Sequence, residues 1–272
     1  MLKQRVITGI IMALVVVAAL VKLDGFWFAL ACGAVMSVAA VEWANLAGLD
    51  KLAARWAFGA FFALTLIAIE YFLSDNLIAI QQILGVAVAW WLLACFLVLR
   101  FPANKELWAG CILRLGIGVV VLAATWLSLV DLQQRSIGLV FFAIALIAFA
   151  DIGAYFTGRT LGRRKLAPQI SPGKTWEGLF GGAVASMALS LGTGLLFGVP
   201  MLHITILLGV TVVVVIFSVV GDLTVSMLKR DRGLEDCGNI LPGHGGLMDR
   251  LDSICAAIPL IGFLMTFSDW GL

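Results

Sequence analysis

The stretch LHITILLGVTVVVVIFSVVGDLTVS, residues 202–226, stays almost continuously apolar until a glycine and an aspartate near its end. A helix needs about 20 predominantly apolar residues to cross the hydrocarbon core of a bilayer, and this stretch has that length. A strand of a membrane β-barrel would be shorter and would alternate apolar with polar residues. The stretch therefore predicts a membrane-spanning α-helix.

Runs of the same kind fill most of the chain. Of its 272 residues, 62% are hydrophobic and 12% are charged, and the mean hydropathy is +1.08, well above the composition of a soluble domain. Nine spans are expected, at residues 5–22, 25–47, 55–73, 76–99, 108–130, 136–158, 176–198, 202–226 and 248–268. We therefore predict an all-α, polytopic integral membrane protein with about nine transmembrane helices.

The first run has a second interpretation, because a basic start followed by an apolar run is also how a signal peptide begins. The run is long enough to span and lacks a clear cleavage site of small residues. We therefore expect a retained first helix.

Basic residues predict the orientation, because cytoplasmic segments of membrane proteins keep an excess of Lys and Arg. With the N-terminus inside, fifteen of them fall on the cytoplasmic side and two, Lys22 and Arg135, on the other, while Arg114 lies near the inner end of the fifth span. This division supports nine spans and a C-terminus outside. We expect an integral protein of the bacterial inner membrane.

Half of the charge lies in two segments on the predicted cytoplasmic face. Residues 151–178 and 221–252 hold seventeen of the thirty-four charged residues. We therefore divide one continuous membrane domain into a scaffold of five spans, residues 1–135, and four spans that carry the site, residues 136–272. The net charge of +2 is explained by topology, so no nucleic-acid partner is expected.

The acidic residues of these segments are the more informative, since membrane topology requires basic residues but no carboxylates. Asp222 lies near the end of the eighth span, and Asp249 and Asp252 share a face at the start of the ninth. Carboxylates that converge from two helices would suit Mg²⁺, which is usually held by one or two carboxylates plus substrate phosphates. The alternative is that they form helix-end salt bridges with Arg250 or other nearby cations.

The basic and glycine-rich residues around these carboxylates suit a polyphosphate. Lys174, Lys229 and Arg230 would neutralise charge that develops in phosphoryl transfer, although they also serve as positive anchors of span ends. Gly243, Gly245 and Gly246 flank His244, which could donate to phosphate or move a proton. A glycine loop entering a helix could also bring N–H groups close to an anion.

The sequence SPGKT, Ser171–Thr175, ends like a phosphate-binding P-loop but is not one, because Pro168 occupies the position of the first glycine. No strand is expected before it. We therefore interpret the sequence as a polar segment that leads into the seventh span, with Glu177 in the first turn of that helix. Lys174 in that first turn would oppose the helix dipole unless it met an anionic partner.

These residues closely resemble the signature of the phosphatidate cytidylyltransferase family, the CDP-diacylglycerol synthases. The pattern is matched over twenty-seven residues by Ser226, Leu228, Lys229, Arg230, Asp236, Gly238, Leu241, Pro242, His244, Gly245, Gly246, Leu247, Asp249, Arg250, Leu251 and Asp252. The upstream pair Gly221–Asp222 and the SPGKT segment are also similar to the family's. One position departs from it: Glu235 stands where the family usually has Lys, so another cation such as Arg232 would have to take its place.

The resemblance implies that CTP and phosphatidate react to give CDP-diacylglycerol and pyrophosphate, with Mg²⁺ required and sometimes described together with K⁺. The residues that we expect to be catalytic are Asp222, Asp249, Lys229, Arg230 and His244. Those expected to bind substrate are Ser171, Lys174, Thr175, Lys229, Arg230, Gly245, Gly246 and Arg250. Those expected to hold the metal are Asp222 and Asp249, with Asp252 in support.

Two other classes of function are alternatives to a cytidylyltransferase. A transporter would distribute polar residues through the depth of several spans, whereas here they gather at one face. A different membrane phosphotransferase is the second class, but the motif of CDP-alcohol transferases is absent, and a lipid kinase would use ATP. Gly178 and Gly182, four residues apart, permit close helix packing within the chain or between two copies in a homodimer.

Overall fold

The computed structural model describes residues 2–74 and 76–267, and these form nine α-helices, one short 3₁₀-helix and one β-hairpin. The helices are α1 (Leu2–Lys22), α2 (Gly25–Ala47), α3 (Leu52–Leu73), α4 (Leu77–Arg100), η1 (Lys105–Leu107), α5 (Cys111–Arg135), α6 (Ile137–Leu161), α7 (Trp176–Leu196), α8 (Met201–Arg232) and α9 (Met248–Met265). The strands β1 (Lys165–Ala167) and β2 (Ser171–Thr175) pair antiparallel. The prediction of an all-α, polytopic membrane protein is confirmed.

Seven of these helices, α2 to α8, are long and apolar enough to cross a membrane. Helix α1 contributes a shorter apolar part, Thr8–Lys22. Helix α9 carries Asp249, Arg250 and Asp252 near its start, and half of its residues are buried in the protein. The ninth predicted span is therefore a helix whose surroundings are mostly other helices.

Two helix ends differ from the prediction because local capping, not hydropathy, sets them. Helix α5 begins at Cys111, since η1 and the residues up to Gly110 form a separate turn. Helix α8 continues to Arg232, where Gly233 adopts a φ of 65° and its N–H reaches back to the last carbonyls, the usual glycine ending of a helix. This extension carries the basic residues Lys229, Arg230 and Arg232 on an ordered helix.

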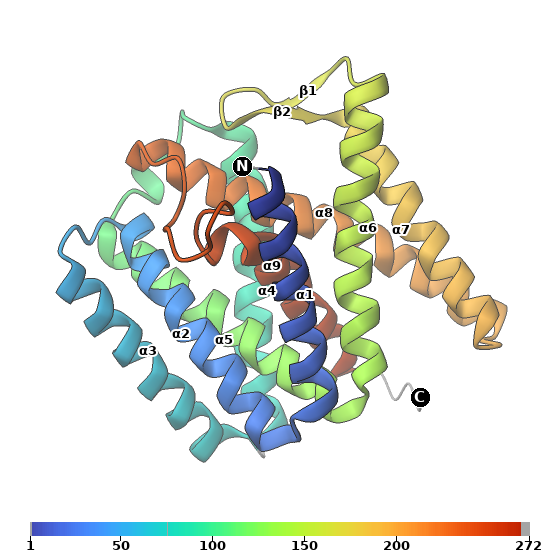
Figure 1. Cartoon of the computed structure of the whole chain (residues 1–272), viewed down its shortest axis with the longest axis horizontal. Coiled ribbons are helices and arrows are strands. Elements are labelled where there is room, and N and C mark those ends of the chain that lie inside the picture. The colour runs from blue at the N-terminus through green and yellow to red at the C-terminus, as the bar shows by residue number, and fades with distance from the viewer. Residues whose placement is uncertain (1, 75, 268–272) are drawn as a thin grey trace.

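The expectation that no strand precedes SPGKT is wrong. Strand β1 comes before it, and Ser171–Thr175 is itself strand β2, which runs directly into α7. A P-loop would need a glycine-rich loop between strand and helix, so the exclusion of that motif holds. The hairpin lies at the same end of the molecule as the start of α1 and the loop of residues 233–247 between α8 and α9 (Figure 1).

Elements from both halves of the chain pack together, with α5 against α2 and α9, and α4 against α8 and α9. In a bilayer, small residues at the contacts allow helices to approach closely. A Cβ on Gly182 would lie 2.5 Å from the carbonyl oxygen of Ala150, and one on Gly178 would lie 2.9 Å from that of Ala154. The two glycines therefore serve the contact of α7 with α6 within the chain.

One buried ion pair fixes the extended end of α8. The Arg114 guanidinium of α5 binds Asp231, which also binds Lys105. Arg114 further donates to the carbonyl oxygens of Trp108 and Leu46, both at 3.2 Å. These contacts connect α5 and α8 with the end of α2 and with η1 and Trp108 after it, and so hold the basic end of α8 in place.

Candidate active site

A polar cavity of about 490 Å³ lies at the end of α8. It is lined by Ile170, Ser171, Ser226, Lys229, Arg230, Gly233, Leu234 and Glu235. Its cations, Lys229 and Arg230, come from the last turn of α8, and Ser171 comes from β2. Arg230 is tied to the hairpin by a 3.2 Å bond from its Nε to the carbonyl oxygen of Ile170. The cavity therefore brings together three predicted substrate residues, with Glu235 on the same wall.

Asp249 lies beside this cavity and is only 5% exposed. Its Oδ1 accepts from Lys229 Nζ at 2.7 Å and from Cys237 Sγ at 3.3 Å. Its Oδ2 accepts from the backbone N–H groups of Cys237 and Gly246, both at 2.9 Å. Asp249 thus pairs with Lys229, not with its neighbour Arg250. We call this group, Lys229, Cys237, Gly246 and Asp249, the loop cluster.

Burial raises the pKa of the Cys237 thiol, and the nearby Asp249 carboxylate raises it further. The thiol therefore stays protonated and serves as a neutral donor to Asp249. Its role is to hold the loop.

The glycines of the loop are required by its shape. Gly245 has a φ of 79°, and a Cβ there would lie 2.8 Å from Asp236 Oδ1 and 3.0 Å from Asp249 Oδ2. Its carbonyl oxygen accepts from Leu241 N at 2.9 Å, which closes a tight turn. Gly243 also has a positive φ, of 76°. These conformations favour glycine strongly.

Three N–H groups in and beside the loop bind carboxylates of the protein, and one of them, that of Gly246, belongs to the glycine loop that the sequence suggested for a substrate anion. Those of Cys237 and Gly246 bind Asp249, and that of Met248 binds Glu42 Oε2 at 2.7 Å. Glu42 lies in α2 and is 4% exposed. A Cβ on Gly238 or Gly246 would lie within 2.7 Å of its oxygens. Glu42 thus anchors the loop and the start of α9.

Sequence reasoning missed Glu42 and two smaller contacts from the first half of the chain. Asn45 Nδ2 donates to the carbonyl oxygen of Cys237 at 3.2 Å, and Thr8 Oγ1 donates to that of Pro242 at 3.1 Å. A signal for Glu42 was present, because an acidic residue inside an apolar span is rare unless it has a task.

His244 and Arg250 are not among the residues that line the polar cavity. The His244 carbonyl oxygen accepts from Arg250 Nη2 at 3.1 Å. His244 Nδ1 is buried with no hydrogen-bond partner in the described part of the chain. A Cβ on Gly9 of α1 would lie 3.9 Å from His244 Nε2. The imidazole is therefore directed toward α1, and a catalytic role for it stays a prediction.

A second group of carboxylates lies one helical turn or more away from the loop cluster along α8 and α9. Asp222 Oδ2 binds Lys174 Nζ at 2.5 Å, and its Oδ1 accepts from Ser226 Oγ at 3.2 Å. Asp252 is close enough to Asp222, Asp151 and Lys174 to interact with their charges. We call Asp151, Lys174, Asp222 and Asp252 the carboxylate cluster. Three carboxylates from α6, α8 and α9 here share one lysine.

A close approach of two helices creates this cluster. A Cβ on Gly221 would lie 2.4 Å from the Asp252 carbonyl oxygen and 2.8 Å from Ala256 Cβ. Only glycine lets α8 and α9 touch at this depth. Lys174 lies in β2 and not in the first turn of a helix as expected, and it reaches the cluster to bind Asp222. Thr175 is buried, and its hydroxyl caps α7 by accepting from Gly178 N at 3.1 Å.

The carboxylate cluster has the donor chemistry of a magnesium site. Within residues 2–74 and 76–267, no three His, Cys, Asp or Glu side chains stand close enough to hold a metal ion by themselves. Mg²⁺ needs only one or two carboxylates when substrate phosphates complete its coordination. Asp222 and Asp252 fit that requirement. Asp249 would first have to exchange its contacts with Lys229 and Cys237 for contacts with a metal.

The comparisons with known proteins agree with the motif. A model of the cytidylyltransferase family matches residues 3–268. Phosphatidate cytidylyltransferase of Pseudomonas aeruginosa is 44% identical and aligns with 100% of this chain and 99% of its own length. The Haemophilus influenzae protein of that name is 35% identical, covering 98% and 99%, and the Bacillus subtilis one is 33% identical, covering 97% of each.

These matches extend over the whole chain, including the motif residues that surround the polar cavity and both clusters. They set aside the transporter and the other phosphotransferases as interpretations of the site. With its fold and its site, the chain belongs to the cytidylyltransferase family and is a membrane-embedded enzyme of the nucleotidyltransferase type.

Proposed function

We propose that this enzyme transfers the cytidylyl group of CTP to phosphatidate, which gives CDP-diacylglycerol and pyrophosphate. The observation that carries the proposal is the polar cavity with Lys229 and Arg230 on its wall, flanked by carboxylates at the ends of α8 and α9. The relatives named phosphatidate cytidylyltransferase support the choice of substrates. The excess of basic residues at this end supports a cytoplasmic orientation, from which CTP would enter.

The reaction needs no nucleophilic side chain, because the phosphate of phosphatidate is already an anion. One of its oxygens forms a bond to the α-phosphorus of CTP. The bond from that phosphorus to the oxygen bridging to the β-phosphate breaks, and the electron pair leaves with pyrophosphate. The chief obstacle is repulsion between two anions, so catalysis depends on position and charge.

Lys229 and Arg230 would bind the triphosphate and stabilise the leaving pyrophosphate. Both are held in place before substrate arrives, Lys229 by Asp249 and Arg230 by the carbonyl oxygen of Ile170. Such preorganised donors cost no reorganisation during the reaction. Ser171 and Ser226 add hydroxyl donors on the same wall.

Mg²⁺ would be held by Asp222 and Asp252, and when bound it would screen the negative charge between the two substrates. Lys174 pairs with Asp222 and would keep a positive charge beside the metal ligands. Asp249 would act mainly by holding Lys229 and the loop, and K⁺ as a second cation stays an expectation from the family resemblance.

The experiment places the radioactive label on different phosphates of CTP. Purified protein is incubated with phosphatidate, Mg²⁺ and CTP labelled at either the α- or the γ-phosphate. The α label should enter the lipid and the γ label should appear in pyrophosphate. A lipid kinase would instead move the γ label to lipid, with diacylglycerol as acceptor. The proposal fails if no α label reaches a lipid product, and EDTA should stop the transfer if Mg²⁺ is required.

A further inference from the structure

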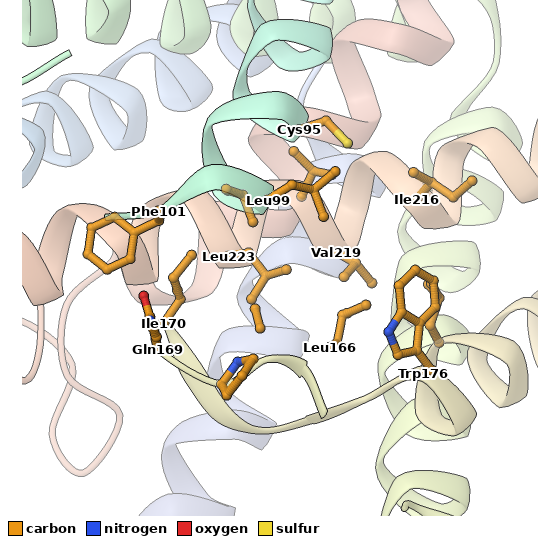
Figure 2. A pocket seen from close by; sticks show the side chains of 15 residues that line it. Cys95, Leu99, Phe101, Leu166, Gln169, Ile170, Trp176, Ile216, Val219 and Leu223 are labelled. Atoms are coloured by element: carbon orange, nitrogen blue, oxygen red, sulfur yellow. The ribbon is translucent and has the colours of Figure 1, made fainter. Parts of the chain in front are cut away.

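An apolar pocket of about 340 Å³ lies next to the polar cavity, among α4, α7, α8 and the hairpin. Its walls include Leu99, Leu166, Ile170, Trp176, Val219 and Leu223. Figure 2 shows Phe101 and Ile170 at one end of it, Trp176 at the other, and side chains of α8 between them. The mechanism proposed above gives this pocket no task.

The pocket adjoins the polar cavity, because Ile170 lines both. The boundary is marked by Arg230, whose Nε binds the Ile170 carbonyl oxygen at 3.2 Å. A cation therefore stands on one side of this residue and an apolar space on the other. That arrangement matches a molecule with an anionic head and an apolar tail.

The depth of the pocket also fits a lipid tail. Its residues in α8, Ile216 to Leu223, precede Lys229 by six to thirteen positions. At about 1.5 Å per residue this is roughly 9 to 20 Å below the lysine along the helix. A lipid whose phosphate lay near Lys229 would place part of an acyl chain at this depth.

The lining of the pocket is almost wholly apolar, and its volume of about 340 Å³ leaves room for a flexible hydrocarbon chain.

We propose that this pocket holds one fatty-acyl chain of the lipid substrate and sets the chain-length preference of the enzyme. The inference rests on the proposed function, since it takes phosphatidate as the lipid. Trp176, which is 42% exposed at one end of the pocket, has the amphipathic ring that favours the border between lipid and water. Val219 and Leu166 line the space where the chain lies.

The test is Val219→Phe, which fills the pocket, compared with Val213→Phe as a matched control. Val213 is on the same helix, is 42% exposed and lies outside the lining. Both variants are assayed in mixed micelles with CTP and either dioleoyl or dihexanoyl phosphatidate. Val219→Phe should lower the ratio of kcat/KM for the long chain to that for the short chain about tenfold, about what losing two buried methylenes predicts. The KM for CTP and the control should stay within about twofold.

An unchanged ratio in an active Val219→Phe enzyme would overturn the inference and leave the proposed function intact. Equal losses on both lipids would overturn it as well. If gel filtration shows that Val219→Phe does not fold, Leu166→Phe fills the same pocket from the hairpin and should give the same shift. A wild-type enzyme that uses neither lipid would refute the proposed function itself.

Discussion

The loop cluster and the carboxylate cluster both combine acidic residues of α8 or α9 with a lysine, yet the hydrogen bonding of their carboxylates differs. Asp249 is 5% exposed and accepts four hydrogen bonds from three residues. Asp222 is 30% exposed and has Lys174 and Ser226 as partners, with Asp252 and Asp151 close by. Both carboxylates have each oxygen engaged, but Asp249 accepts four hydrogen bonds, whereas Asp222 has two partners and further carboxylates nearby.

This difference indicates that the two clusters have different roles. A fully bonded buried carboxylate organises its surroundings, because removing it leaves donors and a lysine without partners. A cluster with three acidic groups and one lysine has more acids than cations, and a bound cation would favour the charged form of those acids. The comparison predicts that variants of the first cluster change stability together with activity, and that variants of the second change activity alone.

Asp222→Asn is expected to have the largest effect. The change removes one predicted metal oxygen and should lower turnover of CTP about 10²- to 10³-fold, as loss of a single electrostatic contact in an active site does. The thermal unfolding midpoint should stay within about 2 °C, since repulsion among the carboxylates decreases. Activity is measured across a series of Mg²⁺ concentrations. Asp131→Asn, an exposed aspartate paired with Arg135, serves as control, and full activity of Asp222→Asn would remove the carboxylate cluster from the chemistry.

Asp249→Asn should lower both the activity and the thermal unfolding midpoint. Activity should fall about tenfold to a hundredfold because Lys229 loses the partner that positions it. Breaking a buried pair costs about 3–5 kcal/mol, and we expect about 2 kcal/mol here because Lys229 is 18% exposed. Differential scanning fluorimetry should show a midpoint about 5 °C lower. Adding Lys229→Met should restore stability but not activity, and a single variant as stable as wild type would contradict the comparison.

Glu42 tests whether the loop is held from α2 as well. Glu42→Ala leaves the Met248 N–H without an acceptor, and the loss of such a bond costs about 1–3 kcal/mol. We expect activity to fall several-fold, with faster hydrogen exchange of the amides at residues 237–248. Glu42→Gln keeps an acceptor oxygen and should stay near wild type. Equal exchange rates in the two variants would mean that the carboxylate does not hold the loop.

Most of the fold could be predicted because the bilayer leaves few choices. A long apolar run must satisfy its backbone internally, so each run became a helix. The ends of α5 and α8 could not be predicted, since Gly110 and Gly233 set them by local conformation. The hairpin was missed because its strands are short and polar and carry no alternating apolar pattern.

The sequence singled out Asp222, Asp249 and Asp252 by their place near span ends, and their role in the site stays a prediction. Nothing in the spacing says that Asp249 pairs with Lys229 and Asp222 with Lys174, because the second pair joins α8 to a residue of the hairpin forty-eight positions earlier. Arg232, the suggested substitute for the family's lysine, instead binds Asp50 at 2.6 Å.

Glu235→Lys should have the smallest effect and tests where the triphosphate lies. Glu235 lines the polar cavity beside Lys229 and Arg230, at the position where the family usually has Lys. A third cation there should lower the KM for CTP about twofold to threefold, since exposed charge pairs contribute at most about 1 kcal/mol. The effect should fade as salt is raised, because ions screen exposed charges.

Glu106→Lys is the matched control, since it makes the same change of charge on an exposed residue of η1, outside the cavity lining. If both variants lower the KM equally, the gain comes from net charge and says nothing about the cavity. If Glu235→Lys leaves the KM for CTP unchanged, the triphosphate does not lie against Lys229 and Arg230. The carboxylate cluster with Lys174 would then have to bind it, which would reverse the division of work between the two clusters.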